Sequence, residues 1–143
     1  MKKIALGLTP TFLGGLIYLV YRNDSLEMFN WFEQINLGSF VNFLRTNEFL
    51  QNLSLPAWVK YSLPNALWLF SFTYLLLLIW NFKINKQSIL WVFIAPVIGV
   101  AFEVGQFFKL VSGTFDINDL FLLTLAAILP FSLMLNLKTT KYK

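Results

Sequence analysis

Long apolar runs alternate with short polar segments along the chain, and this alternation predicts the architecture. Four runs approach the roughly 20 residues that a helix needs to cross a hydrocarbon core of about 30 Å. They cover residues 4–21, 64–82, 88–108 and about 119–137. The connections between the last three runs are short, so we expect these helices to pack as antiparallel neighbours. The pattern predicts an all-α polytopic membrane protein, with residues 1–143 forming one membrane domain around a four-transmembrane-helix bundle.

The first connection, residues 22–63, is too polar to cross a bilayer and too apolar for a free loop. Asp24 followed by Glu27 predicts a helix N-cap with a capping box. Gly38 predicts the end of that helix, and Ser39 predicts the cap of a second one. We expect amphipathic helices that lie at the outer membrane interface or fold over the bundle. An ordinary loop packed on the bundle is an equally weighted alternative.

The composition agrees with membrane burial and fixes the expected orientation. The chain is 57% hydrophobic and 13% charged, whereas soluble domains are about 25% charged. The first run lacks a small-residue cleavage site, so we interpret it as an uncleaved helix rather than a signal peptide. We expect a location in the cell inner (cytoplasmic) membrane, and the positive-inside rule favours both termini in the cytoplasm. The basic residues on the predicted inner side are Lys2, Lys3, Lys83, Lys86, Lys138, Lys141 and Lys143.

The residue inventory restricts the available chemistry. The chain contains no Cys and no His, which excludes thiolate catalysis and removes the commonest general base and metal ligand. Any acid–base or metal chemistry must therefore use carboxylates. The net charge of +4 does not indicate nucleic-acid binding, because the Lys residues lie at the ends of the apolar runs. We predict no cofactor and no nucleic-acid partner, and we expect contact with membrane lipids.

Three of the seven acidic residues lie between Glu103 and Asp119, at the predicted turn between the last two spans. Glu103 lies about 7–8 Å inside the end of its span at 1.5 Å per residue, where a carboxylate facing lipid is unfavourable. Polar and small residues at spacings of three and four predict one inward stripe on each of these two helices. The facing stripes are Pro96, Gly99, Glu103 and Gln106 on one helix, and Asp119, Leu123, Ala126 and Pro130 on the other.

These acidic residues have structural as well as functional interpretations. Asp116 at the N-cap and Asp119 at the third helical position both suit the positive end of the last helix. Glu103 beside Gln106 could be a neutral carboxylic acid in a structural hydrogen bond. The functional interpretation is an acidic pocket open to the outside, since ionisable residues within a membrane often mark functional sites.

The order Glu103-Val-Gly-Gln106 followed by Gly113-Thr-Phe-Asp116-Ile-Asn-Asp119 resembles the VanZ-like family of integral membrane proteins. The resemblance implies a role in the cell envelope, because the family's namesake is associated with low-level resistance to the glycopeptide teicoplanin. The chain departs from the family pattern at three places. Thr114 replaces an Arg, Leu123 replaces an Asn, and the Asp-Lys and His pattern of an earlier span is absent. Without the Arg, a cation or amine ligand fits the mouth better than a phosphate does.

Three functions follow as hypotheses. In the first, Glu103 and Asp119 form the core of an outward pocket, with Gln106 and Asp116 at its rim and residues 22–63 as its roof. The pocket would bind or act on a lipid-linked envelope component or a glycopeptide-type antibiotic. In the second, the carboxylates hold Mg²⁺ or Mn²⁺, or serve as general base and acid, in an enzyme that acts on a lipid headgroup. In the third, the chain is a non-catalytic subunit that packs on a membrane-protein partner or on a second copy of itself. Whether the chain is an enzyme stays open.

Overall fold

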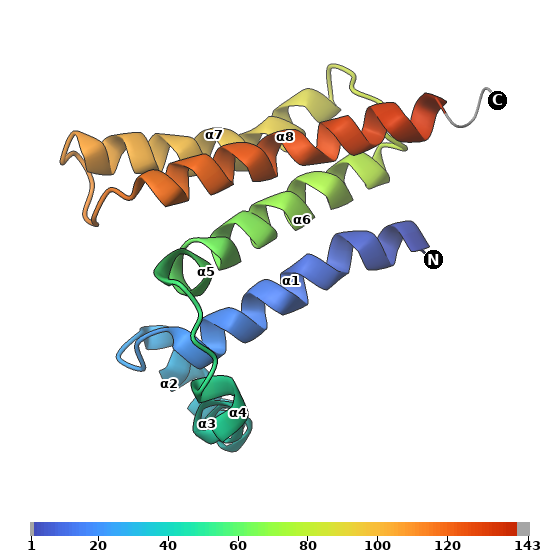
Figure 1. The fold of residues 1–143 in the computed structure, drawn as a ribbon. Helices are drawn as coiled ribbons and strands as arrows, with labels where there is room; N and C mark the ends of the chain where they lie inside the picture. Colours follow the sequence, from blue (N-terminus) through green and yellow to red (C-terminus); the bar gives the residue numbers. More distant parts are fainter. Residues whose placement is uncertain (1, 140–143) are drawn as a thin grey trace.

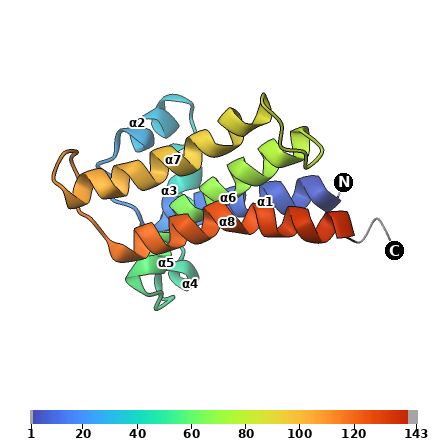
Figure 2. The same cartoon turned by 90° about the horizontal axis from the view of Figure 1, so that it is seen from above.

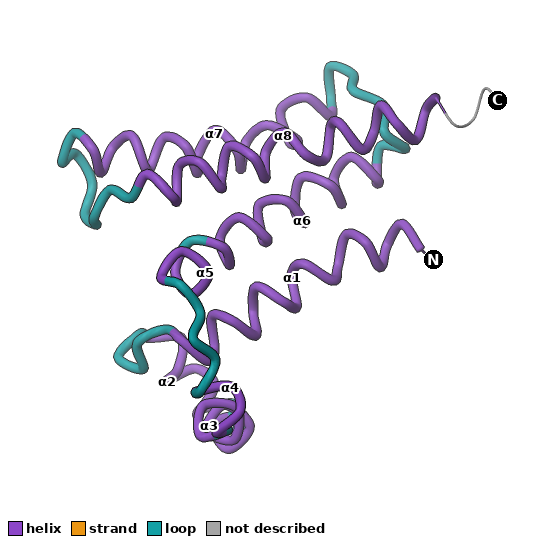
Figure 3. The backbone as a smooth tube through the Cα atoms, in the orientation of Figure 1, coloured by secondary structure: helices purple, strands orange, loops and turns teal. Residues whose placement is uncertain are grey.

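The computed structural model describes residues 2–139, with side-chain positions for residues 2–135. Within these residues every regular element is a helix, and Figure 3 shows the helices joined by loops. Lys141 and Lys143, used above for the predicted orientation, lie outside the described residues. The helices are α1 (Lys2–Tyr21), α2 (Glu27–Gln34), α3 (Gly38–Thr46), α4 (Glu48–Gln51), α5 (Ala57–Tyr61), α6 (Leu63–Ile79), α7 (Ser88–Phe107) and α8 (Ile117–Thr139).

Three of the helices within residues 2–139 are long and apolar enough to cross a membrane: α1, α7 and α8. The all-helical fold is therefore confirmed, and three of the four predicted spans coincide with helices that could cross a membrane. The remaining predicted span, residues 64–82, contains the shorter helix α6, which has 17 residues and ends at Ile79. The helix stops there because Asn81 and Phe82 adopt positive φ angles of 50° and 56°. This turn folds Phe82 back so that its backbone N–H donates to the Leu77 carbonyl at 2.7 Å.

Helix α6 is the centre of the bundle. Figure 1 shows α1 along one side of α6, and α7 and α8 together along the other. Seen from above in Figure 2, α6 is visible in the space between α7 and α8. Apolar side chains of α6 pack against α8 in two buried clusters, one near each end of the bundle. The first cluster joins Tyr74 and Leu77 to Val92 and Met134. Helix α6 contacts α1, α7 and α8, so it joins the other three helices although it is the shortest of the four.

Two glycines let α1 approach α6 closely. Gly7 and Gly14 are both buried, and a Cβ atom at Gly14 would lie 2.9 Å from Trp68 Nε1 and 3.1 Å from the Pro64 carbonyl oxygen. The Trp68 indole N–H donates to the Thr11 carbonyl at 3.1 Å, and its ring lies 5.0 Å from that of Tyr18. The α1–α6 interface therefore depends on the absence of a side chain at these positions.

The segment between α1 and α6 contains helices, as predicted, but their boundaries differ. Leu26, not Asp24, is the N-cap residue of α2, and it makes no side-chain capping bond. Asn36 adopts the left-handed conformation, with φ of 60°, just after α2. Gly38 is the first residue of α3, and Ser39 lies within that helix. The predicted capping box and Gly38 stop are therefore wrong, because an asparagine at Asn36 tolerates the left-handed turn that we assigned to glycine.

The position of this segment also corrects an expectation. Helix α3 packs on α1, and α5 packs on α6 and α1. Figure 1 shows α2, α3 and α4 beside the end of α1, on the side of the bundle away from the turn between α7 and α8. The prediction that residues 22–63 roof the acidic residues is therefore wrong.

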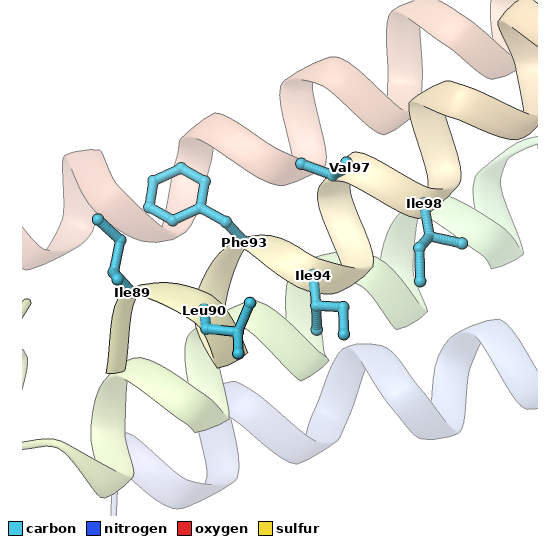
Figure 4. A pocket seen from close by; sticks show the side chains of 6 residues that line it. All are labelled: Ile89, Leu90, Phe93, Ile94, Val97 and Ile98. Carbon is cyan, nitrogen blue, oxygen red and sulfur yellow. The ribbon is translucent and has the colours of Figure 1, made fainter. Parts of the chain in front are cut away.

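Helix α7 is buried along one narrow stripe and exposed elsewhere. Its buried residues are Ser88, Val92, Pro96 and Glu103. The opposite side carries an apolar groove of about 530 Å³, in which one row of side chains lies nearer α8 and a second row points away from it (Figure 4). The lining residues are Ile89, Leu90, Phe93, Ile94, Val97 and Ile98. A surface of this composition suits hydrocarbon rather than water.

Candidate functional site: the turn between α7 and α8

The turn between α7 and α8 begins with a tight helix end. Lys109 adopts a φ of 58°, in the left-handed region. Its backbone N–H donates to Gln106 at 3.0 Å, and the N–H of Leu110 donates to Gly105 at 2.8 Å. These two bonds form the helix-end pattern that usually places glycine at the left-handed position. The chain therefore reverses direction directly after the last turn of α7.

Gln106 is held within this turn by contact with Gly113. Gly113 has a φ of +134°, and a Cβ atom there would lie 2.6 Å from Gln106 Nε2. The Gln106 side chain therefore packs across the glycine backbone. Phe115, which follows, packs its ring edge-to-face against Phe107 at 5.2 Å. These contacts fix the turn that carries the predicted rim residues.

Asp116 is the cap of α8, as the structural interpretation predicts. Its Oδ1 atom accepts hydrogen bonds from the Asn118 backbone N–H and from the Asn118 side-chain amide, both at 2.9 Å. Its carbonyl accepts the first helical bond, from the Leu120 N–H at 3.2 Å. The contribution of Asn118 was not predicted, although an aspartate followed two residues later by an amide side chain is a recognisable local signal.

Glu103 points into the bundle, as the stripe on its helix predicts. Its side chain is 7% exposed. The backbone N–H of Asp116 and the carboxylates of Asp119 and Asp116 are close enough to interact with its carboxylate electrostatically. We call Glu103, Asp116 and Asp119 the acidic cluster. The structure thus brings together three of the four predicted site residues, with Gln106 beside them in the turn.

Two carboxylate oxygens of the acidic cluster lack partners. Glu103 Oε2 and Asp119 Oδ1 are both buried, and neither has a hydrogen-bond partner among the described residues. Asp119 lies in the first turn of α8, where the helix dipole favours negative charge. The dipole does not replace a direct partner, because a buried polar atom without one costs about 1–3 kcal/mol. The geometry therefore suits a proton, a cation or a hydrogen-bond donor placed between the two helices.

Below the acidic cluster, the predicted stripes of α7 and α8 face each other. A Cβ atom at Gly99 would lie 3.9 Å from the Leu123 side chain of α8 and 4.0 Å from Leu69 of α6. Leu123 and Ala126 are buried in the same apolar group as Leu69. Both stripes consequently face α6 as well as each other, which the sequence pattern did not indicate. The inner wall of the cluster is apolar.

The acidic cluster does not have the geometry of a three-carboxylate metal site. No group of three or more acidic side chains among the described residues is arranged so that it could hold a metal ion. The metal-dependent enzyme hypothesis gains no support from the arrangement. The cluster can instead engage a ligand through individual hydrogen bonds and charge.

Residues 2–139 thus define an all-helical protein with three helices able to cross a membrane and an acidic cluster, centred on the buried Glu103, at one end of the bundle. Comparison with protein-family models, with curated proteins and with solved structures finds no match.

Proposed function

We propose that this chain is a VanZ-like integral membrane protein of the cell envelope whose acidic cluster binds the amine group of a lipid-linked envelope component or of a glycopeptide-type antibiotic. The observation that carries the proposal is the pair of buried oxygens without partners, Glu103 Oε2 and Asp119 Oδ1. An ammonium group supplies several N–H donors and a positive charge, so it can satisfy both oxygens at once. The resemblance of the Glu103–Asp119 segment to the family supports the envelope role.

The residue at position 114 favours a cationic ligand over an anionic one. The family pattern places an Arg there, and this chain has Thr114, which is exposed. An arginine would supply the planar donor set that phosphate and carboxylate groups prefer. Thr114 carries no positive charge, so it does not offset the negative charges of the acidic cluster. A ligand whose positively charged amine enters first is therefore attracted by the negative charges of the acidic cluster.

We also propose that α6 is a fourth span, with both termini in the cytoplasm. Its 17 residues correspond to about 26 Å at 1.5 Å per residue, near the lower limit for crossing a hydrocarbon core. The contacts of α6 with α1, α7 and α8 support its place among them. Lys83 and Lys86, in the connection between α6 and α7, favour the cytoplasm for that end of the bundle. The acidic cluster then lies at the outer surface.

To test this proposal, the charges of Glu103 and Asp119 are removed together and the susceptibility of cells to teicoplanin is measured. Glu103→Gln with Asp119→Asn keeps the size of both side chains and removes their charges. Cells that lack the native protein are complemented with either form, and their susceptibility to teicoplanin is measured together with the amount of inserted protein. We expect the double variant to insert normally and to lose the protection that the native chain confers.

Glu48→Gln is the matched control. Glu48 is an exposed acid of α4, so this variant also loses a negative charge but should keep the native phenotype. Full protection by the folded, inserted double variant would contradict the proposal. So would an equal loss in the Glu48 variant, because the effect would then depend only on net charge.

A further inference from the structure

A second polar site lies between α2 and α3, apart from the acidic cluster. The structure contains a cavity of about 180 Å³ there, roughly six times the volume of about 30 Å³ that one water molecule occupies in the liquid. Its charged and amide side chains come from both helices and from the segment that precedes α2. The residues used below are Asp24, Phe29, Glu33 and Arg45.

Arg45 provides a fixed positive charge in this cavity. One of its nitrogens, Nη1, donates to the Leu19 carbonyl at 3.1 Å and to the Arg22 carbonyl at 2.9 Å, at the end of α1. The guanidinium group also lies over the Phe29 ring, 4.9 Å from its centroid. The Nε and Nη2 atoms make no hydrogen bond to any described residue. The guanidinium is therefore anchored through one nitrogen while its other donors remain available for an anionic group.

Two carboxylates provide the opposite charge in the same cavity. Asp24 and Glu33 are exposed, and within residues 2–135 neither side-chain carboxylate forms a hydrogen bond or an ion pair. Neither carboxylate forms an ion pair with Arg45, although all three side chains line the cavity. A cavity with one free set of donors and two free carboxylates is complementary to a ligand that carries both charges.

The position of the cavity indicates where such a ligand is found. Arg45 binds the carbonyl end of α1, a helix long enough to cross a membrane, so the cavity lies at the level of a membrane surface. Nearby apolar side chains of α2 and α3 are exposed: Trp31 is 60%, Phe40 55% and Phe43 64% exposed. Aromatic side chains of this kind concentrate at the headgroup level of bilayers.

We propose that the α2–α3 cavity binds the zwitterionic headgroup of a phospholipid that carries a phosphate and a primary ammonium, with the phosphate on Arg45 and the ammonium on Asp24 and Glu33. This site goes beyond the proposed function, because it shares no residue with the acidic cluster. The guanidinium fork matches phosphate oxygens, and the two acids match an ammonium group. A headgroup bound here ties α2 and α3 to the membrane surface beside α1.

The test measures lipid binding by the purified full-length chain in detergent micelles. Dilauroyl phosphatidylethanolamine and dilauroyl phosphatidylglycerol are added separately, and retained lipid is measured by native mass spectrometry and thermal unfolding. These lipids share their chains and phosphate, but only the first has an ammonium group. We expect tighter binding of phosphatidylethanolamine, and a loss of about tenfold or more in Asp24→Asn with Glu33→Gln, since the ammonium group then loses both of its charged partners.

Three comparisons keep this proposal falsifiable. Glu48→Gln, in the neighbouring helix α4, should bind phosphatidylethanolamine as the native chain does. Competition by free phosphoethanolamine would show that the headgroup alone is recognised, and absence of competition would show that the bound species is the intact lipid. Equal binding of the two lipids, or unchanged binding after loss of Asp24 and Glu33, would overturn the proposal. A loss confined to the Glu103 and Asp119 variant would overturn it as well, by assigning lipid binding to the acidic cluster.

Discussion

Replacing Gly14 by alanine tests whether α1 packs closely against α6 at Gly14, as the structure shows. The new methyl group would lie 2.9 Å from Trp68 Nε1 and 3.1 Å from the Pro64 carbonyl oxygen. The first contact is with a side chain that is held by its hydrogen bond to Thr11. The second is with backbone, which cannot rotate away. We therefore expect Gly14→Ala to separate the two helices or to displace the Trp68 ring.

The magnitude follows from three contributions. Overpacking in a close interface costs about 1–3 kcal/mol, and displacement of Trp68 loses a hydrogen bond worth about 0.5–1.5 kcal/mol. Alanine has a higher helix propensity than glycine, which stabilises the variant by about 1 kcal/mol and offsets part of the loss. The expected net loss in the free energy of unfolding is about 0.5–3.5 kcal/mol.

Gly15, the next residue in the same helix, is the matched control. A Cβ atom there meets nothing within 4 Å, so Gly15→Ala should stabilise the helix by about 0.5–1 kcal/mol. Thermal unfolding of both variants in the same detergent, followed by circular dichroism, measures the difference. Equal melting temperatures for the two variants would refute the packing of α1 on α6 described above.

Three further predictions concern the turn between α7 and α8, and each is measured by thermal unfolding. Asp116→Ala removes the cap of α8 and should cost about 0.5–2 kcal/mol, whereas Asp116→Asn should retain most of the stability; equal losses would show that capping is not the role of Asp116. Lys109→Gly should stabilise the fold by about 0.5–1 kcal/mol, because glycine adopts the left-handed conformation without the steric cost that lysine has there; a destabilised variant would contradict the helix end described at this residue. Gly113→Ala should be destabilising, both because its φ is +134° and because the methyl group would meet Gln106 at 2.6 Å. In a Gln106→Ala background the contact part of that loss should disappear while the conformational part remains.

The three long apolar helices and the direction of Glu103 could be predicted because both depend on local sequence pattern. The apolar runs fix where α1, α7 and α8 lie, and the spacing from Pro96 to Glu103 fixes which side of α7 is buried. The length of α6 could not be read in this way. Phe82 is as apolar as the residues before it, yet it is buried beneath the ring of Tyr74, at 5.6 Å between ring centroids, after a reversal of the chain. Only the tertiary contact distinguishes it from a further helical residue.

The cavity between α2 and α3 was not predicted for a related reason. Arg45 reaches back 26 residues to the Leu19 carbonyl, and no local pattern indicates that contact. The capping rules placed helix boundaries at Asp24 and Gly38, whereas the chain uses Leu26 and Asn36. These rules rank residue types by average preference, and a short helix that packs on a neighbour can begin without its best cap.

The buried prolines of α7 and α8 bear on how anything reaches Glu103. Pro96 and Pro130 are both buried inside their helices, and each removes one intrahelical hydrogen bond. Because Gly99 lies opposite Leu123 in this antiparallel pair, the two prolines are within about one helical turn of each other in height. Resistance to bending is consequently weakest at nearly the same level in both helices. We therefore expect any bending of the two helices to occur near that level, between the acidic cluster on one side and the contacts of Tyr74 and Met134 on the other.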